Sequence, residues 1–163
     1  MKRWLREILI GLVLIFLISL LLNTYRTYDK KSFDTIPNLQ ARLIDGSYFD
    51  IHQLDNKPII VHFWATWCRV CRTEIDNLAK LSKTHQVITI AVASGTDKEL
   101  VDFLESLDID LLVYNDNDST IAHKMGIEMY PTTLIYDSQK SLRFAEVGYR
   151  TTAGLKARLK LIE

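Results

Sequence analysis

Two cysteines separated by two residues are the part of this sequence whose types and spacing best suit covalent chemistry. The chain has 163 residues and only 2 Cys, Cys68 and Cys71. A disulfide that closes so short a loop removes little entropy from the unfolded chain, so a purely structural bridge is the weaker interpretation. Two thiols at this spacing instead suit reversible thiol–disulfide exchange, provided that the first lies where a helix begins.

Metal binding is the main alternative use of such a pair. A structural zinc ion needs four ligands, and a second pair of Cys or His with ligand spacing is absent from the sequence. The four histidines are scattered, at His52, His62, His85 and His123. A lone pair of cysteines can still hold a soft copper ion, so copper binding stays open. We otherwise expect no cofactor beyond a redox-active Cys68–Cys71 disulfide.

The residues around the cysteines predict the elements that position them. Residues 59–64 form a continuous apolar run, which is typical of a buried strand. A short turn follows, and a helix is expected from about Cys68, with helical spacing of apolar residues over 72–83. Free N–H groups and the positive dipole end at a helix start stabilise a thiolate at Cys68. Cys71 then lies one turn further along, placed to attack a mixed disulfide on Cys68.

Strand and helix patterns alternate along the rest of the chain, which predicts an α/β fold with parallel pairing at its centre. Strands are expected at 39–44, 48–51, 59–64, 87–93, 111–114, 132–136 and 142–147. Helices are expected at 72–83, 97–107 and 119–125, and from Thr151 or Thr152 to about Ile162. In the helix at 97–107, one predicted apolar face is formed by Leu100, Val101, Leu104 and Leu107.

The N-terminal region predicts a membrane anchor. Residues 8–22 are apolar apart from Gly11 and Ser19, and Lys2, Arg3 and Arg6 precede them. We expect a cytoplasmic N-terminus at 1–7, a transmembrane signal anchor at 8–25, a stalk at 26–36 and an exported domain at 37–163. A cleaved signal peptide is the alternative, although the end of the apolar run lacks the small residues that cleavage requires. The lipid bilayer is therefore an expected partner, and the exported compartment permits disulfides.

The distribution of charge argues against a nucleic-acid partner. The chain has 20 basic and 20 acidic side chains, of which six and two lie in residues 1–31. Residues 32–163 therefore keep 14 basic and 18 acidic side chains, a net charge of −4. Nucleic-acid-binding domains carry a basic face instead.

Two segments resemble the signatures of the thioredoxin superfamily. The first is Phe63-Trp64-Ala65-Thr66-Trp67-Cys68-Arg69-Val70-Cys71-Arg72, which is similar to the active-site segment, and the second is Met129-Tyr130-Pro131-Thr132-Thr133, which is similar to the cis-proline loop. The resemblance covers about 37–162 and implies a thioredoxin fold, with a central mixed sheet flanked by helices. It also implies that Pro131 is cis and packs against the disulfide, and that the backbone of Tyr130 pairs with a substrate.

Other features resemble one branch of that superfamily. The N-terminal hairpin and the extra strand–helix unit at 87–107 are similar to the membrane-anchored TlpA-like branch, and the residues around the cysteines most resemble its suppressor for copper sensitivity protein D subgroup. This resemblance implies a thiol–disulfide oxidoreductase on the bacterial inner membrane, with its catalytic domain in the periplasm. Its expected partners are protein thiols or disulfides and a DsbD-like membrane thiol transporter that supplies electrons.

Several alternative functions stay open. The protein can be a disulfide-forming oxidase with a quinone-linked partner, or a redox-inactive scaffold or copper-binding module. A peroxidase is less compatible with the sequence, because Ala65 stands three residues before Cys68, where peroxidatic sites carry Thr or Ser.

The sequence departs from the thioredoxin pattern inside and before the cysteine pair. His62 occupies the position of a buried Asp, either as a hydrogen-bonded core histidine or as a substitute base. Arg69-Val70 replaces the usual Gly-Pro, and the charge of Arg69 favours a thiolate at Cys68, which predicts a more oxidising centre than thioredoxin's. Screening of an exposed arginine by water is the alternative.

Residues next to the pair receive more modest roles. Trp67 resembles the family's tryptophan that shapes the contact surface, and Tyr130 is expected to influence the choice of partner. Arg72 and Glu74 are expected to be solvated helix residues without a catalytic role.

Overall fold

The computed structural model describes Gly11, Leu14, Ile36 and residues 39–162. The predicted anchor at 8–25 and stalk at 26–36 lie outside these residues, apart from Gly11, Leu14 and Ile36. Among the residues described, no helix is both long enough and apolar enough to cross a bilayer.

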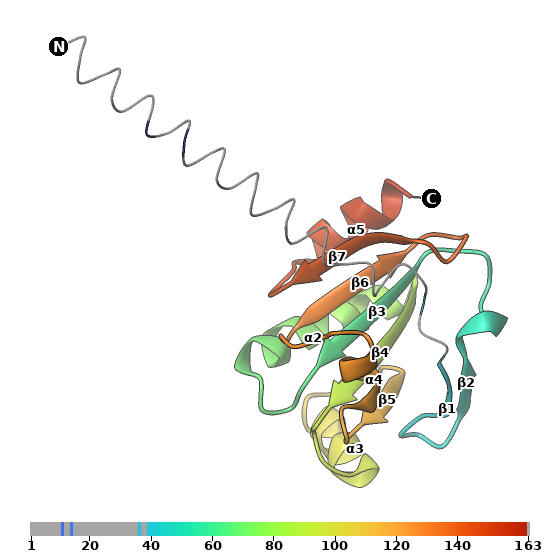
Figure 1. Ribbon diagram of the computed structural model, residues 1–163. Coiled ribbons are helices and arrows are strands. Elements are labelled where there is room, and N and C mark those ends of the chain that lie inside the picture. Colours follow the sequence, from blue (N-terminus) through green and yellow to red (C-terminus); the bar gives the residue numbers. More distant parts are fainter. Residues whose placement is uncertain (1–10, 12–13, 15–35, 37–38, 163) are drawn as a thin grey trace. The chain divides into compact units, whose positions relative to one another are not determined.

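A mixed five-stranded sheet forms the centre of the fold, in the order β5-β4-β3-β6-β7 (Figure 1). Its strands are β3 (Ile59–Trp64), β4 (Gln86–Val92), β5 (Val113–Asp116), β6 (Thr132–Tyr136) and β7 (Leu142–Val147). β3 pairs in parallel with β4, and β4 with β5, whereas β6 and β7 run antiparallel. The predicted α/β fold of the thioredoxin type with a mixed sheet is confirmed.

A separate two-stranded hairpin precedes the sheet. It consists of β1 (Gln40–Arg42) and β2 (Tyr48–Asp50), and a 3-10 helix, η2 (Ile51–Gln53), follows it. The turn between the strands contains Gly46 at φ 85°, where a glycine avoids the strain that a side chain would bring. The N–H of Ile44 donates to the carbonyl of Val113 at 3.1 Å, so the chain after β1 joins the outer edge of β5.

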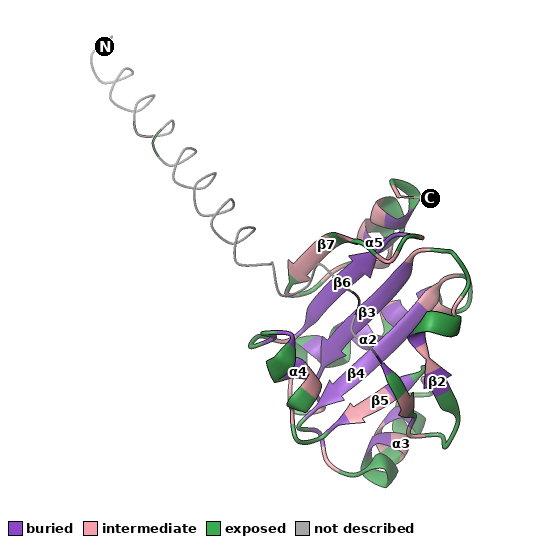
Figure 2. Ribbon diagram, turned by 45° about the vertical axis from the view of Figure 1, so that its right-hand side comes forward, coloured by how far each residue is buried: buried purple, intermediate pink, exposed green. Residues whose placement is uncertain are grey.

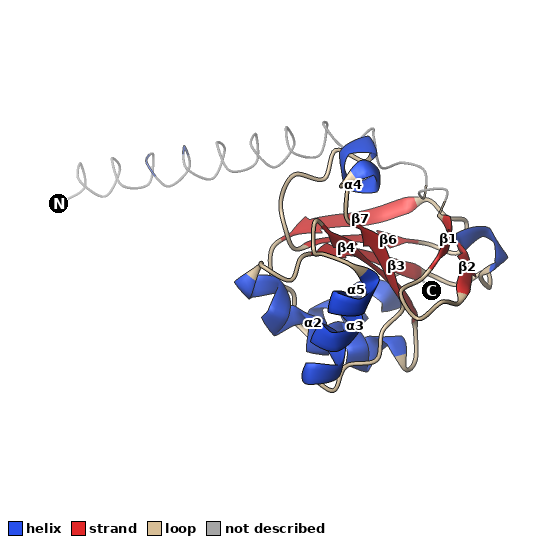
Figure 3. Cartoon of the chain, turned by 90° about the horizontal axis from the view of Figure 1, so that it is seen from below, coloured by secondary structure: helices blue, strands red, loops and turns tan. Residues whose placement is uncertain are grey.

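Helices cover both faces of the sheet (Figure 3). α2 (Arg69–Ser82), α3 (Asp97–Ser106) and α5 (Thr152–Lys160) lie on one face, and the short α4 (Thr120–Lys124) lies on the other. α3 begins with a capping box between Thr96 and Glu99, and Thr151 caps α5 through the N–H of Gly154. These caps explain why both helices begin where the sequence predicts.

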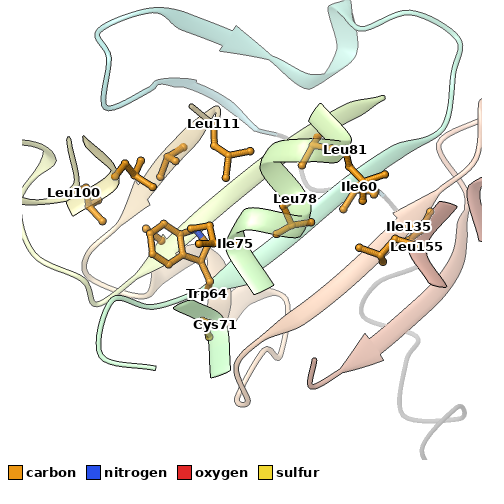
Figure 4. Packing of buried hydrophobic residues seen from close by; sticks show 14 of the residues in the cluster. Ile60, Trp64, Cys71, Ile75, Leu78, Leu81, Leu100, Leu111, Ile135 and Leu155 are labelled. Atoms are coloured by element: carbon orange, nitrogen blue, oxygen red, sulfur yellow. The ribbon is translucent and has the colours of Figure 1, made fainter. Parts of the chain in front are cut away.

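The main core lies between α2, α3, α5 and the sheet. Trp64, Ile75 and Leu78 meet there, and Cys71 lies at the end of the same layer (Figure 4). β3, β4 and β6 are buried along most of their length, whereas the outer strand β7 is partly exposed (Figure 2). The cysteine pair is therefore attached to the most firmly packed part of the domain.

Three local predictions differ from the structure. The strand expected at 111–114 spans Val113–Asp116 instead, because its pairing with β4 runs from Val113 to Asp116. Leu107 is 42% exposed because α3 ends at Ser106 and leaves Leu107 as its C-terminal cap. Glu74, expected in solvent, is fully buried.

Candidate active site

Cys68 lies at the end of the turn that connects β3 to α2. β3 ends at Trp64, and the N–H of Cys68 donates to the carbonyl of Ala65 at 3.1 Å, which closes the turn. Cys68 is the N-cap of α2, and its Sγ accepts the N–H of Cys71 at 3.2 Å. An anionic sulfur at this position would receive that hydrogen bond and the positive end of the helix dipole, which together favour the thiolate.

The second cysteine is enclosed by the core. Cys71 is fully buried beneath α2, whereas Cys68 is partly exposed, and the two sulfurs are joined in a disulfide of 2.23 Å. Only Cys68 can therefore be reached by a large molecule. Cys71 can act only on a sulfur already attached to Cys68.

The cis-proline loop faces the disulfide from the neighbouring strand. The Tyr130–Pro131 peptide bond is cis, as the resemblance predicts. The carbonyl oxygen of Tyr130 lies 3.7 Å from Sγ of Cys68, and Pro131 itself is buried. The loop is held from both ends, because the hydroxyl of Thr132 donates to the carbonyl of Met129 at 2.7 Å and the N–H of Gly148 donates to the carbonyl of Pro131 at 2.8 Å.

Trp67, next to Cys68, is anchored by Ala93, a residue that no sequence pattern singles out. Its indole Nε1 donates to the carbonyl of Ala93 at 3.0 Å, and its ring meets Tyr130 edge to face at 5.7 Å. Ala93 has φ 45°, a left-handed conformation that costs a non-glycine residue roughly 1 kcal/mol. Next to it, the hydroxyl of Ser94 accepts the N–H of Thr66 at 3.0 Å. The β4–α3 loop therefore fixes the turn that carries Trp67.

The residues between the cysteines point outward. Arg69 is exposed, and Val70 is 46% exposed. The structure thus places a positive charge and an apolar side chain at the open side of Cys68. Nearby, the side chain of Arg72 is not free in solvent, because its Nε donates to the carbonyl of Thr66 at 2.7 Å and its guanidinium lies 5.3 Å from the ring of Phe103.

His62 is fully buried in the middle of β3. Its Nδ1 lies 3.0 Å from the hydroxyl of Thr133, and its Nε2 has no hydrogen-bond partner within the described part of the chain. Burial lowers the pKa of His62 to about 3, so the ring is neutral at physiological pH. These contacts favour the interpretation of His62 as a core histidine.

Glu74 is a buried ionisable residue next to the cysteine pair that the sequence did not predict. It lies three residues after Cys71 on the face of α2 that packs on the sheet, and its side chain is fully buried. Neither carboxylate oxygen meets a hydrogen-bond partner in the region that the structure describes. Burial raises the pKa of Glu74 to about 7, against the opposing influence of Arg150, so the carboxyl can gain or lose a proton near neutral pH.

The signal for this burial was present in the helical spacing. Position 74 falls on the stripe defined by Cys71, Ile75 and Leu78, because residues three and four apart share a helix face. Its charge alone suggested solvent. Metal ligands, by contrast, do not gather near the pair: no group of three or more His, Cys, Asp or Glu side chains that could hold an ion occurs among the described residues.

Fold and site together define a class of protein. A cysteine pair at the start of a helix, facing a cis-proline loop in a thioredoxin-type sheet, is the arrangement of a thiol–disulfide oxidoreductase, and this protein is such an enzyme. The model of the AhpC/TSA family matches residues 33–145, so the chain belongs to that family.

Individual relatives agree with this class. The chain is 27% identical to thioredoxin-like protein YneN of Bacillus subtilis over 99% of each chain. It is 25% identical to thiol–disulfide oxidoreductase ResA of the same organism, over 78% of this chain and 73% of that one. Among solved structures, a thioredoxin-family thiol:disulfide interchange protein of Chlorobium tepidum superposes with a TM-score of 0.69 at 26% identity, covering 77% of this chain and 93% of the other.

Proposed function

We propose that this enzyme exchanges disulfides with exported protein thiols through Cys68 and Cys71, and that it works as a reductase. The observation that carries the proposal is the position of Sγ of Cys68, which caps α2, accepts the N–H of Cys71 and faces the carbonyl of Tyr130 at 3.7 Å. This geometry supports a nucleophilic thiolate beside a backbone group that can align an extended client.

In the proposed first step, the thiolate of Cys68 attacks one sulfur of a client disulfide. A new bond forms between Cys68 and that sulfur, the client S–S bond breaks, and the second client sulfur leaves as a thiolate. The partial exposure of Cys68 and the burial of Cys71 support this division of roles.

In the second step, Cys71 gives up its thiol proton and attacks Cys68. The Cys68–Cys71 bond forms, the bond between Cys68 and the client sulfur breaks, and that sulfur leaves as a thiolate, so both client sulfurs are reduced and two electrons pass from the enzyme to the client. We assign Glu74 as the acceptor of the Cys71 proton, because residues at i and i+3 are neighbours on a helix face and because a carboxyl with a pKa of about 7 is matched to neutral pH. His62, with a pKa of about 3, is a much poorer acceptor.

The surroundings of Cys68 support a contact surface for clients. Trp67 and Met129 are each 61% exposed, and Val70 adds a further apolar side chain beside the pair. In the proposal Tyr130 and Pro131 align the client backbone, while Trp67, Arg69 and Val70 contact its side chains. An extended segment with apolar residues next to its cysteine fits this surface better than a charged one.

Reduction outside the cytoplasm requires a supply of electrons. We propose that residues 8–25 anchor the protein in the bacterial inner membrane with residues 1–7 in the cytoplasm, that residues 26–36 form a stalk, and that residues 37–163 form the periplasmic domain. A DsbD-like membrane thiol transporter then re-reduces the pair, and anchoring raises the effective concentration of the two partners. Deletion of residues 1–25 behind a cleavable export signal should release the domain from membranes and leave its pair oxidised in cells.

Trapping of a mixed disulfide tests the chemistry. A Cys71→Ala variant should accumulate a covalent complex with client proteins that dithiothreitol dissolves, because nothing then attacks the Cys68–client bond. The Cys68→Ala variant is the matched control and should trap nothing. Absence of any complex with Cys71→Ala would support a redox-inactive scaffold or copper-binding module instead.

The direction of transfer is tested in the cell. Alkylation of intact cells should find the Cys68–Cys71 pair mostly reduced, and oxidised when the membrane thiol transporter is deleted. A pair that is mostly oxidised in both strains would support the disulfide-forming oxidase.

A further inference from the structure

The segment between β7 and α5 is clamped against the helix that carries Glu74. Asn77, three residues further along α2, donates through Nδ2 to the carbonyl of Arg150 at 3.2 Å and to the hydroxyl of Tyr149 at 3.1 Å. Its Oδ1 accepts the hydroxyl of Thr152 at 3.0 Å. Because residues three apart on a helix are neighbours, Asn77 places Arg150 beside Glu74.

Arg150 forms an ion pair with one carboxylate and acts electrostatically on a second, deeper one. Its Nε donates to one oxygen of Glu146 on β7, and the other oxygen of Glu146 accepts Nε of Arg158 from α5. The side chains of Glu146 and Arg150 are 13% and 32% exposed, so their pairing is only partly screened by water. Glu74, which is fully buried, is the deeper of the two carboxylates.

Few other ionisable groups face Glu74. Strand pairing aligns His62, Thr133 and Glu146 in one row across β3, β6 and β7, on the sheet face that α2 covers. His62 is neutral, and Cys71 on α2 itself is bonded in the oxidised protein.

The remaining groups come from the segment before α5 and from α5. They are the phenol of Tyr149, which is held by Asn77, and the guanidinium groups of Arg150 and Arg158. Arg150 favours the charged form of Glu74, first through the dipole of its backbone N–H and then through the charge of its guanidinium, and Glu146 opposes that form. Arg158 pairs with Glu146 and is not among the groups that act on Glu74.

We propose, as an extension of the proposed function, that Arg150 is a positioning residue for the reaction: held by Asn77 and shared with Glu146, it keeps the buried Glu74 carboxyl able to exchange its proton. Without a nearby cation, a carboxyl in this layer would stay protonated and could accept nothing from Cys71. Glu146 limits the effect, because it occupies part of the same guanidinium and carries a like charge.

Removing the charge of Arg150 and removing the charge of Glu146 should shift the pKa of Glu74 in opposite directions. A cluster with only a structural role would not produce this difference in sign. Glu δ-carbon resonances of the full-length oxidised chain are followed against pH by NMR, with Glu74→Gln used to assign the Glu74 signal. In the oxidised protein neither cysteine titrates. Arg150→Gln keeps the backbone N–H at position 150 but removes the guanidinium charge, so it should raise the pKa of Glu74, and Glu146→Gln should lower it.

Two further variants serve as controls. Arg158→Gln, like Arg150→Gln, removes one guanidinium partner of Glu146. It should shift the pKa of Glu74 by less than about a third of the shift that Arg150→Gln causes. Arg150→Lys keeps the charge and should restore most of the wild-type value, whereas Asn77→Ala should shift the titration in the direction of Arg150→Gln.

Equal shifts for Arg150→Gln and Arg158→Gln would overturn the proposal, as would shifts of the same sign for Arg150→Gln and Glu146→Gln. The titration needs no turnover, so its failure is distinct from failure of the proposed function. If Arg150→Gln shifts the titration but Glu74→Gln leaves thiol exchange unchanged, the positioning of Glu74 by Arg150 holds and its role as proton acceptor is wrong.

Discussion

Two buried ionisable groups lie between α2 and the sheet, and burial shifts their pKa values in opposite directions. His62 and Glu74 are both fully buried, and each has side-chain atoms without a hydrogen-bond partner in the described chain. Burial pushes both towards their neutral forms, which lowers the pKa of His62 and raises that of Glu74. The type of group decides the result, because burial moves the pKa of a carboxyl towards pH 7 and the pKa of an imidazole away from it. Arg150 limits the rise at Glu74, whereas His62 meets an uncharged hydroxyl, so Glu74 is the one of the two that can exchange a proton near pH 7.

The largest effect should come from replacing the carboxyl itself. Glu74→Gln should slow the attack of Cys71 on the mixed disulfide roughly 100-fold at pH 7, because the thiol loses its proton acceptor. His62→Asn should change the same rate by less than about threefold. Release of client thiol from a preformed mixed disulfide, followed by rapid quenching, measures both variants. A larger loss for His62→Asn would reverse the comparison.

Glu74 and His62 should also affect the pH dependence of the unfolding free energy in opposite ways. Between pH 4.5 and about 7, the folded protein binds more protons at Glu74 than the unfolded chain does, so this residue stabilises the fold as the pH falls. Between about 3 and 6.5, the unfolded chain binds more protons at His62, so this residue destabilises the fold as the pH falls. From pH 4.5 to 6.5 the two contributions oppose each other.

Single variants should expose each contribution. Relative to wild type, His62→Leu should gain stability as the pH falls through that window and Glu74→Gln should lose it, each by up to about 1.4 kcal/mol per pH unit. Urea unfolding at half-unit pH steps gives the slopes. Parallel curves for the two variants would contradict the assignment of either group.

The partner of His62 provides a smaller test. Thr133→Val keeps the shape but removes the hydroxyl 3.0 Å from Nδ1 of His62, and should cost about 1–2 kcal/mol of unfolding free energy. Thr133→Ser keeps the hydroxyl and serves as the control, with a clearly smaller loss. The valine penalty should disappear in a His62→Leu background, since no buried ring nitrogen is then left unpaired.

The exposed charge beside the cysteines should have the smallest effect. Arg69→Gln should make the pair more reducing by about 10 mV, because water and salt screen an exposed guanidinium. Equilibration with glutathione at low and high ionic strength measures the change, which should shrink as salt is added. Wild type should lie above the thioredoxin value of about −270 mV. A potential at or below it would refute the prediction that Arg69 makes the centre oxidising.

The sequence predicted the elements that carry the cysteines better than the layer beneath them. The bounds of β3, β6 and β7, the start of α2 and the cis bond before Pro131 are all confirmed, because apolar runs, turn residues and two local signatures determine them. Glu74 was misplaced because a charged side chain suggests solvent, although its helical position indicates the core. Its neighbour Arg150 lies 76 positions away, and only the folded topology brings the two together.

The carbonyl of Ala93, which holds Trp67, could not be predicted from the sequence either. No pattern marks Ala93 as a residue with positive φ, because alanine rarely adopts that conformation, and no pattern shows that its carbonyl accepts the indole N–H of Trp67. Contacts of this kind arise from the approach of two loops and carry no local periodicity.

The left-handed conformation of Ala93 has a consequence for the stability of the loop that holds Trp67. A non-glycine residue keeps a left-handed conformation only where its surroundings hold it, and Ala93 is held at both backbone groups: its N–H donates to the carbonyl of Asp116 at 3.2 Å, and its carbonyl accepts the indole N–H of Trp67. Trp67 and the turn at Thr66 are both bonded to this loop, so the conformational cost at Ala93 is borne where the tryptophan is held. Glycine at position 93 would remove the cost of a positive φ in the folded protein and keep the carbonyl that Trp67 binds.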